Sequence, residues 1–439
     1  MRLPDLLATR RGRLAAFFLL YLTEGIPAGF TATAVATQMR RQGLEPAAIG
    51  AFIGALYLPW AVKWAFGPFV DVLSSDRWGR RRMWILITQG MMVVTILAAM
   101  PVSFTTRLWL FTAIVFVHNI FSATQDVAID ALAVGVLRGD ERGLANGLMF
   151  GGQYIGNALG GSGVLLLTPF LGFKNTFLFV AALIALVTLL VPVPMRELPG
   201  PARLATTGSR LHAIGAELLK FVRDTGRAFL GSRPATIAIF LALLPMGGYA
   251  LSLALQSNLA VELGLDDRKI GTLGLMSTTL SAGFCILGGW LSDRYGRRRT
   301  LAIFIAGTTL PTFAMAFAMH RFGWILPVSP QMPNRPIPPH ELVTAFWYLT
   351  LGYAVFQGLM YGVGTAIYMD VTTPAVAATQ FTGYMALCNL VYSYTATWQG
   401  HAVGRWGYPL TLTIDGLVGL VSVCLLPFMG RPRPGPPPE

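Results

Sequence analysis

The chain has 439 residues, of which 54% are hydrophobic and only 12% are Asp, Glu, Lys or Arg. Soluble globular proteins carry about twice that charged fraction. Because the apolar residues stand in long uninterrupted runs, the composition excludes a soluble enzyme, a disordered chain and a disulfide-stapled secreted module.

Twelve apolar stretches of about 18 to 25 residues follow one another along the chain, each long enough to cross a bilayer as a helix. None shows the alternation of outer-membrane strands. We therefore predict an all-α membrane protein with twelve transmembrane helices. They cover residues 14–37, 47–70, 84–104, 108–136, 143–169, 175–195, 235–259, 270–292, 300–320, 342–368, 379–400 and 408–429.

The basic residues predict the orientation of these helices. Arg10, Arg11 and Arg13 resemble the start of a signal peptide, but Glu24 and Pro27 interrupt the apolar region that follows, which favours a retained helix. With the N-terminus inside, 23 Lys and Arg lie in cytoplasmic segments and nine on the opposite side. This bias predicts that both termini are cytoplasmic. It also makes the net charge of +13 weak evidence for a nucleic acid partner.

One long connection, residues 196–233, divides the helices into two sets of six. Its apolar and basic residues alternate at helical spacing, which predicts an amphipathic helix at the inner membrane surface. The apolar residues are Leu211, Ile214, Leu218, Phe221 and Val222, and the basic residues are Arg210, Lys220, Arg223 and Arg227. We predict six-helix bundles at 1–195 and 234–430, joined by this linker, and a Pro-rich, disordered tail at 431–439.

An internal repeat relates the two sets of helices. DRWGRRR (Asp76–Arg82) and DRYGRRR (Asp293–Arg299) lie 217 positions apart. Upstream of them, QGLEPAAIG (Gln42–Gly50) matches LGLDDRKIG (Leu263–Gly271) at a distance of 221 positions. Because both basic strings follow the second helix of their set, the halves are predicted to be parallel repeats about an axis along the membrane normal.

A Gly-x-x-x-Asp string precedes each basic loop, GPFVD (Gly67–Asp71) and GWLSD (Gly289–Asp293). The small glycine is expected to let a neighbouring helix approach closely. The Asp is expected to pair with a loop Arg or a helix N-terminus, and the glycine of each GRRR string to form a tight turn. LSSDRW follows Asp71 in the first copy, so either Asp71 or Asp76 could take this role, and we favour Asp71. The predicted cytoplasmic gate comprises Gly67, Asp71, Asp76, Arg77, Gly79, Arg80, Arg81, Gly289, Asp293, Arg294, Gly296, Arg297 and Asp370.

Twelve helices in two parallel halves with this paired loop motif resemble the major facilitator superfamily over essentially the whole chain. The resemblance implies a secondary transporter that works by alternating access between two six-helix bundles.

Further strings resemble one branch of that superfamily. They are YLTEGIPAGF (Tyr21–Phe30), LPWAVKWAFGPFVD (Leu58–Asp71), GRRRMWILITQ (Gly79–Gln89), ATQDVAIDA (Ala123–Ala131) and AATQFTGYMAL (Ala377–Leu387). The branch contains AmpG-type muropeptide permeases, endoplasmic-reticulum acetyl-coenzyme A transporters, and permeases for siderophores of the rhizobactin and pyochelin kind. The longer AmpG-type proteins carry additional helices for which this chain has no residues, so the substrate stays open among these classes.

Ionisable residues inside the spans are functional candidates, because burying a charge in lipid costs several kcal/mol. Glu24 lies ten residues into the first helix, roughly 15 Å deep. It is expected to bind a proton or the solute, or else to pair with a neighbouring helix. His118 and Asn119 lie at a similar depth in the fourth helix. There His118 could pair with Glu24 or be hydrogen-bonded in the core.

Gln125, Asp126 and Asp130 lie nearer the inner end of the fourth helix, where the two carboxylates share a face. They are expected either to couple protons, which we favour for Asp126, or to pair with arginines of the 77–82 loop, which we favour for Asp130. Asp370 occupies the related place in the second half.

The sequence indicates the roles of two further charged residues, Lys63 and Asp415, less clearly. Lys63 lies close enough to the cytoplasm to snorkel, but it could instead neutralise Asp71 or an anionic solute. Asp415 in the last helix is expected to be peripheral. The proton-coupling candidates are therefore Glu24, Asp126, Asp130 and His118.

Neutral polar groups on several helices suit a large polar solute better than a bare ion, although helices also use such groups to bind one another. Gly152, Gly156 and Gly160 repeat every four residues, which predicts tight helix packing in the fifth span. The solute-site candidates are Lys63, Gln125, Gln153, Tyr154, Asn157, Gln256, Asn258, Gln357, Tyr361, Asn389 and Tyr392.

The sequence contains no Gly-x-x-x-x-Gly-Lys-Ser/Thr string, no HExxH string and no paired Cys/His motif. We therefore expect no enzyme activity, no cofactor and no metal site, and an ion or solute gradient as the energy source. We predict a monomeric, proton-coupled importer of a bulky, polar, anionic solute in the inner membrane. Muropeptide is the first choice, siderophore the second and acetyl-coenzyme A the third. An exporter of drugs or metabolites and a non-transporting receptor are the alternatives.

Overall fold

The computed structural model of the chain describes residues 5–73, 77–137, 142–197, 210–371 and 377–429. Helices make up most of this part, and no strand occurs in it, in agreement with the predicted all-α class. The predicted tail at 431–439 and the gate candidate Asp76 lie outside the described residues.

The helices follow one another in two series. The first is η1 (Leu6–Ala8), α1 (Arg10–Gly29), the π-helix η2 (Phe30–Val35), α2 (Ala36–Arg41), α3 (Pro46–Ala61), η3 (Lys63–Phe66), α4 (Gly67–Val72), α5 (Arg80–Ala99), α6 (Leu108–Val136), α7 (Arg142–Ala158), the π-helix η4 (Leu159–Gly163), α8 (Val164–Leu171) and α9 (Phe173–Leu190). The second is α10 (Arg210–Leu230), α11 (Arg233–Ala242), α12 (Ala254–Glu262), α13 (Asp267–Tyr295), α14 (Arg297–Arg321), α15 (His340–Val371), α16 (Ala377–Leu425) and η6 (Leu426–Phe428).

Nine helices of the described residues are long and apolar enough to cross a membrane. The remaining predicted spans are broken or joined. Residues 47–70 are divided among α3, η3 and α4, and residues 235–259 between α11 and α12. The spans at 379–400 and 408–429 are joined in α16, where Gly407 with a φ of 78° marks a kink. The number of twelve spans therefore stays a prediction.

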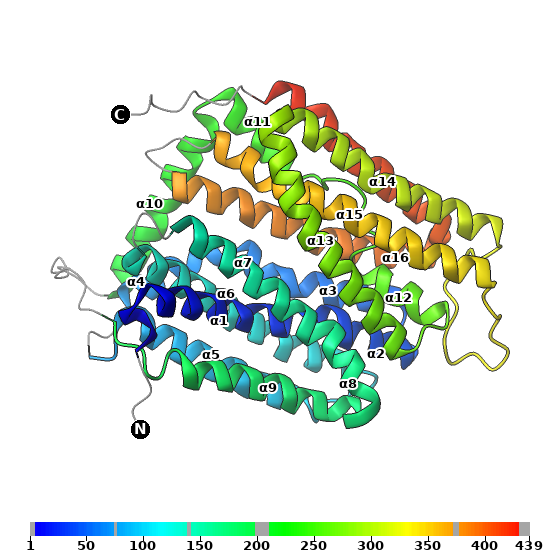
Figure 1. The fold of residues 1–439 in the computed structure, drawn as a ribbon, viewed down its shortest axis with the longest axis horizontal. Helices are drawn as coiled ribbons and strands as arrows, with labels where there is room; N and C mark the ends of the chain where they lie inside the picture. Colours follow the sequence, from blue (N-terminus) through cyan, green and yellow to red (C-terminus); the bar gives the residue numbers. More distant parts are fainter. Residues whose placement is uncertain (1–4, 74–76, 138–141, 198–209, 372–376, 430–439) are drawn as a thin grey trace. The chain divides into compact units, whose positions relative to one another are not determined.

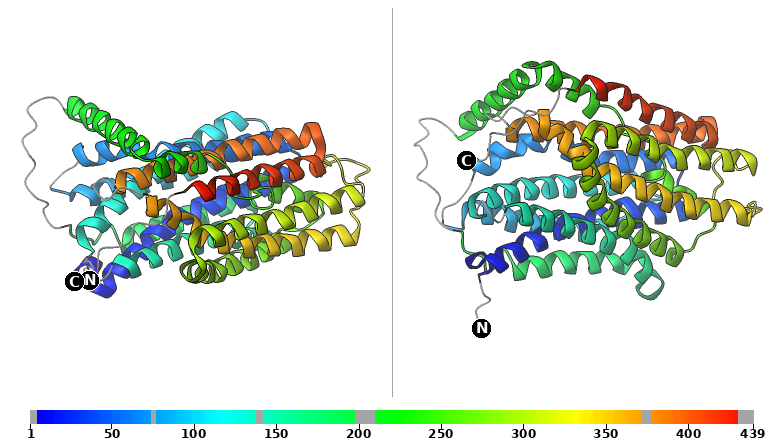
Figure 2. Two further views of the ribbon diagram at one scale, coloured as in Figure 1. Left: turned by 90° about the horizontal axis from the view of Figure 1, so that it is seen from above. Right: turned by 45° about the horizontal axis from the view of Figure 1, so that its top comes forward.

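The structure divides into two compact units. Unit 1 comprises Met1–Leu44, Ala55–Leu218 and Leu265–Leu275, and unit 2 comprises Glu45–Gly54, Leu219–Gly264 and Met276–Glu439. Within unit 1, α1 packs against α7, and α5 packs against α6 and α9 (Figure 1). Within unit 2, α14 packs against both α15 and α16, which the turned views also show (Figure 2).

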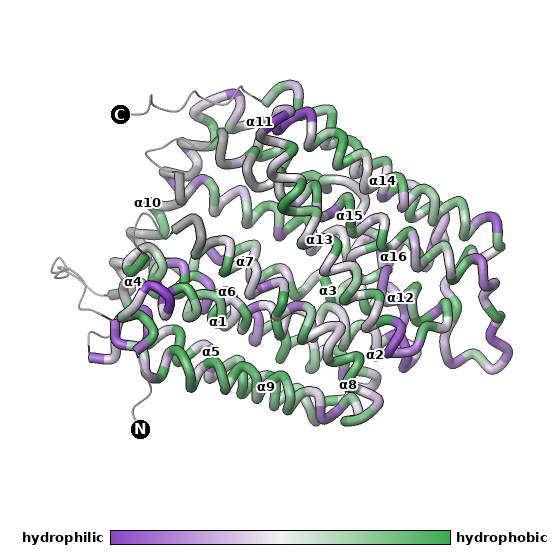
Figure 3. Tube along the Cα trace, viewed as in Figure 1, coloured by the Kyte–Doolittle hydropathy of each residue, from purple (hydrophilic) through white to green (hydrophobic). Residues whose placement is uncertain are grey.

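Large apolar side chains are exposed on the outer helices. α9 is predominantly hydrophobic along its length (Figure 3), and its Leu178, Leu186 and Leu189 are about half exposed. Continuous apolar surface of this kind requires lipid in place of water. The chain is therefore a multi-pass membrane protein.

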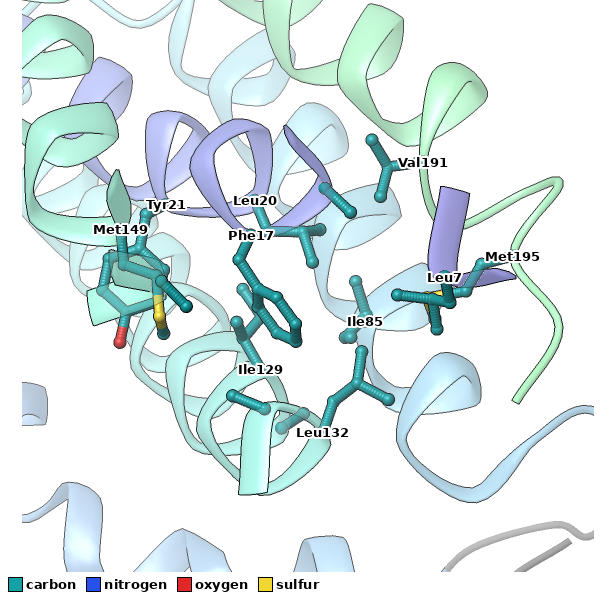
Figure 4. Packing of buried hydrophobic residues seen from close by; sticks show 14 of the residues in the cluster. Leu7, Phe17, Leu20, Tyr21, Ile85, Ile129, Leu132, Met149, Val191 and Met195 are labelled. Carbon is teal, nitrogen blue, oxygen red and sulfur yellow. The ribbon is translucent and has the colours of Figure 1, made fainter. Parts of the chain in front are cut away.

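The core of unit 1 lies around the first helix. Phe17 and Leu20 of α1 are fully buried and pack with Ile85 of α5 and with Ile129 of α6 (Figure 4). Tyr21 belongs to the same cluster, so its ring is anchored in apolar packing while its hydroxyl group remains available for a polar contact.

The repeated strings have the same backbone turns in both halves. Gly79 and Gly296, the glycines of the two GRRR strings, have φ values of 85° and 91°. The upstream pair Gly43 and Gly264 has φ values of 88° and 79°. Glycine adopts this left-handed conformation without the Cβ clash that other residues meet, so the predicted tight turns are confirmed.

The predicted close helix contact at the Gly-x-x-x-Asp glycines is wrong. Among the described residues, a Cβ added to Gly67 or Gly289 would meet no atom within 4 Å. In the second copy the preceding residue, Gly288, makes the close approach, because its Cβ would collide with the backbone of Leu359 on α15. Neighbouring helical residues point about 100° apart, and the motif alone does not show which of two adjacent glycines faces the partner.

The glycine repeat of α7 and η4 packs directly on α1, as predicted. A Cβ at Gly152, Gly156 or Gly160 would collide with the backbone oxygen of Phe18, Leu22 or Ile26, respectively. Close backbone approach of this kind is how helices associate when lipid supplies no hydrophobic drive between them.

Replacing Gly156 by Ala is expected to destabilise the folded protein by about 1–3 kcal/mol, because the added methyl group forces α7 away from α1. Gly151, whose added Cβ would meet no atom within 4 Å, supplies the matched control Gly151→Ala on the same helix. Thermal unfolding in detergent, followed by size exclusion, measures both. Equal melting temperatures for the two variants would contradict the packing.

Candidate functional site

Four charged side chains of unit 1, Glu24, Lys63, Asp126 and Asp130, form an acidic cluster. The Lys63 Nζ lies 2.6 Å from Oδ2 of Asp126, and these side chains are only 18% and 5% exposed. The hydroxyl group of Tyr21 donates to Oδ1 of Asp130 over 2.6 Å. Glu24 is close enough to interact electrostatically with the other three.

Glu24 and Lys63 of the acidic cluster both lie next to irregular helix segments. Glu24 stands three residues before Pro27, which cannot donate the usual helix hydrogen bond, and α1 then passes into the π-turn η2. π-turns inside α-helices are frequent at functional sites. Lys63 follows the end of α3, which contains Pro59, and lies in the 3-10 turn η3.

The charges of the acidic cluster do not balance if every carboxyl group is ionised, since three acids face one ammonium group. Asp126 has Lys63 and Asp130 has the Tyr21 hydroxyl group. Glu24, by contrast, is 1% exposed, and neither of its oxygens accepts from a donor among the described residues. The polar group within hydrogen-bond reach of it is the carboxyl group of Asp126. A buried carboxylate without a donor is costly, whereas a proton on a carboxyl group provides a donor to a neighbouring acid.

A layer of amide and hydroxyl groups lies beside the cluster. Gln125 was a solute-site candidate, but it is fully buried and donates to Thr23 Oγ1 over 2.8 Å. Gln89 also donates to Thr23 over 3.2 Å, and Thr188 donates to Gln89 over 2.7 Å. These bonds tie α1, α5, α6 and α9 together, so they hold the helices that carry the acids.

His118 faces α5 instead of the acidic cluster. Its Nδ1 lies 2.9 Å from Thr95 Oγ1 and 3.2 Å from the carbonyl oxygen of Met92. Its neighbour Asn119 donates to the carbonyl oxygen of Val115 and accepts from the indole N–H of Trp60 over 3.3 Å. The contacts of His118 therefore support the core role, and its coupling role stays a prediction.

The neutral candidates divide between the two units. In unit 1, the half-buried Gln153, Tyr154 and Asn157 lie on α7. In unit 2, Tyr361 is 38% exposed, and Asn258 is fully buried with neither amide atom bonded to a residue that the structure describes. The others, Gln256, Gln357, Asn389 and Tyr392, are half-buried.

An acid that sequence reasoning missed holds the first basic loop. Oε2 of Glu197 accepts from the backbone N–H groups of Arg81 and Arg82 over 2.8 and 2.9 Å. The guanidinium group of Arg81 donates to the carbonyl oxygen of Val70. A carboxylate at the N-terminus of α5 also matches the helix dipole, so Glu197 fixes the start of this helix.

The other gate candidates are less completely described. In the second loop, Arg294 lies over the rings of Trp290 and Tyr295, 5.7 and 5.9 Å from their centroids. The side chains of Asp71, Asp293 and Asp370 lie outside the described part. The cytoplasmic Asp–Arg gate therefore stays a prediction.

The chain matches a family model and is similar in sequence to known permeases. The Major Facilitator Superfamily model matches residues 14–330 and, in a second match, residues 237–439. The chain is similar to the anhydromuropeptide permease of Escherichia coli K12, with 27% identity over 94% of this chain and 79% of that one. It is also similar to the putative transporter AmpG 4 of Rickettsia felis, with 25% identity over 87% and 84% of the two chains.

A solved structure supports the fold. The inward-open xylose transporter XylE of E. coli has a TM-score of 0.68 with 13% identity, over 97% of this chain and 98% of that one.

Proposed function

Since this chain belongs to the major facilitator superfamily, we propose that it imports a bulky, polar, muropeptide-like solute together with protons across the inner membrane. It is a secondary transporter of a small molecule and not an enzyme. The observation that carries the coupling proposal is Glu24, which is buried beside two further acids and accepts from no donor among the described residues.

The acidic cluster suits reversible protonation. Lys63 can compensate one carboxylate, so protonation of a second acid lowers the unbalanced charge when the site is closed to water. Release of that proton on the cytoplasmic side restores the charged form. Coupling follows if the two protonation states favour different conformations.

The relatives support the choice of solute. The E. coli relative is a permease for anhydromuropeptide, and the match extends over most of both chains. Neutral amides and phenols on several helices suit a sugar–peptide solute. Siderophore and acetyl-coenzyme A import, and export of a drug or metabolite, follow as alternatives.

The proposal includes a topology. We place twelve transmembrane helices in bundles at 1–195 and 234–430 of a monomer, with both termini in the cytoplasm. The linker at 196–233 lies on the inner membrane surface. The presence of α10 within this linker supports the predicted amphipathic helix.

Reconstitution into proteoliposomes tests the function. Labelled anhydromuropeptide is expected to accumulate when the outside is more acidic than the lumen, and a protonophore should reduce the lumen concentration to the external level. Unchanged accumulation without a pH gradient would refute coupling. Competition by a ferric siderophore or by acetyl-coenzyme A, but not by excess muropeptide, would refute the solute. A receptor would give no uptake of any of the three.

A further inference from the structure

An unwound segment, residues 243–253, separates α11 from α12 in unit 2. Most of it is buried, and Tyr249, Ala250 and Leu251 are at most 3% exposed. Non-helical backbone at membrane depth must have its N–H and C=O groups satisfied by protein or by a water-filled cavity. The partners of this segment therefore indicate what it is for.

Asp415 of α16 is the main partner. Its Oδ2 accepts from the backbone N–H groups of Tyr249 and Ala250 over 2.8 and 2.9 Å. Its Oδ1 accepts from Nε2 of Gln399 over 2.7 Å. Asp415 is 2% exposed, so the expectation of a peripheral residue is wrong. A hydropathy pattern gives the depth of a residue in a span but not the direction in which it points.

Other contacts complete the attachment of the segment. The N–H group of Gly247 donates to the carbonyl oxygen of Gly419 over 3.2 Å, and Gly247 has a φ of 86°. The hydroxyl group of Tyr394 donates to the carbonyl oxygen of Leu243 over 2.7 Å. The segment is thus attached at its first residue, at Gly247 and, through Asp415, at Tyr249 and Ala250.

The unwound segment carries aromatic and hydroxyl side chains at and next to the two residues whose N–H groups Asp415 binds. The Tyr249 ring lies 5.1 Å from the ring of Tyr392, a solute-site candidate. Oγ of Ser252 lies 3.1 Å from the Tyr353 hydroxyl group. Aromatic faces and hydroxyl groups together are the usual lining of a site for a polar organic solute.

We propose that Asp415 is a positioning residue for the transported solute, which it does not touch. By holding the N–H groups of Tyr249 and Ala250, it fixes the unwound segment so that the half-buried Ser252 and Tyr392, whose ring packs on the buried ring of Tyr249, form one wall of the solute site. This inference rests on the proposed transport function. Irregular helices are a known means of building such sites in transporters.

Two substitutions of Asp415 distinguish its role in positioning the segment from an effect of its negative charge. Asp415→Asn keeps one oxygen for the two backbone N–H groups, and its new amide can donate to Oε1 of Gln399, which is buried and has no partner in the described part of the chain. Asp415→Ala loses all three bonds. Positioning therefore predicts that the alanine variant raises the KM for labelled anhydromuropeptide at least tenfold, while the asparagine variant stays within threefold of the wild type.

Hydrogen–deuterium exchange of the purified, full-length protein adds a readout independent of transport. Exchange of the amides in 243–253 should rise in Asp415→Ala and remain near the wild-type rate in Asp415→Asn. Gln399→Ala, which removes only one of the three bonds, should give an intermediate rate if the alanine variant does not fold. Thr413→Ala, whose hydroxyl group bonds only to its own helix, is the control and should match the wild type.

Equal exchange and equal KM in Asp415→Ala and wild type would overturn the proposal. An asparagine variant as inactive as the alanine variant, with a protected segment, would also overturn it, since the carboxylate charge and not the attachment would then be required. A wild-type protein that takes up no muropeptide would refute the proposed function. The exchange rates would still decide whether Asp415 holds the segment.

Discussion

Uptake driven by a proton gradient is expected to fall at least about tenfold when Glu24 is replaced by Gln, while exchange of labelled for unlabelled solute is retained. Glutamine has the size and hydrogen-bonding capacity of a protonated carboxyl group, but it cannot release a proton. The variant should therefore bind solute and change conformation without coupling to the gradient. Accumulation and counterflow in the same proteoliposomes measure the two activities separately.

Glu341→Gln is the matched control, because Glu341 is exposed at the start of α15. It should accumulate solute like the wild type. Loss of both accumulation and counterflow in Glu24→Gln, with normal yield and melting temperature, would assign Glu24 to solute binding instead of coupling. Full accumulation in this variant would exclude Glu24 from both roles.

Hydropathy and the internal repeat were sufficient to predict the helical class and the superfamily. Both GRRR strings begin with the same left-handed glycine turn in the two halves, as their identical sequences suggested. The repeat did not predict where the halves differ. The first helix is interrupted by the π-turn η2, whereas its counterpart is unwound between α11 and α12. The unwound form depends on Asp415, which lies far along the chain.

Residue type indicated which charged side chains deserved attention, but not how they pair. Glu24, Lys63, Asp126 and Asp130 were selected because charges are rare in spans, and they lie together in unit 1. The pairing of Lys63 with Asp126 was not foreseen, since it depends on the end of α3 before Lys63. Tyr21 could have been selected, because it stands one helical turn before Glu24 and hence on the same face.

The sequence pattern did not indicate the structural roles of Gln89 and Glu197. A single amide in an apolar helix is equally compatible with a solute contact and with helix packing, and only the bond to Thr23 decides between them. Glu197 follows the sixth predicted span, and its bonds to the start of α5 join segments more than a hundred residues apart.

Replacing Lys63 by Met is expected to destabilise the protein by about 3 kcal/mol or more, because it leaves Asp126 buried without its cation. Asp126→Asn should do the same by leaving the ammonium group of Lys63 without its anion. The double variant, Lys63→Met with Asp126→Asn, should recover most of the lost stability, since a neutral buried pair has no unbalanced charge. Melting temperatures of the four proteins complete the double-mutant cycle.

Lys269→Met is the control for removal of a lysine charge, because Lys269 is exposed, and its melting temperature should stay near that of the wild type. Additive losses in the double variant would show that Lys63 and Asp126 do not interact. If the double variant recovers its stability but fails to accumulate solute, the ion pair is needed for the transport cycle and not only for folding. Recovery of both would leave Glu24 and Asp130 as the acids on which proton coupling depends.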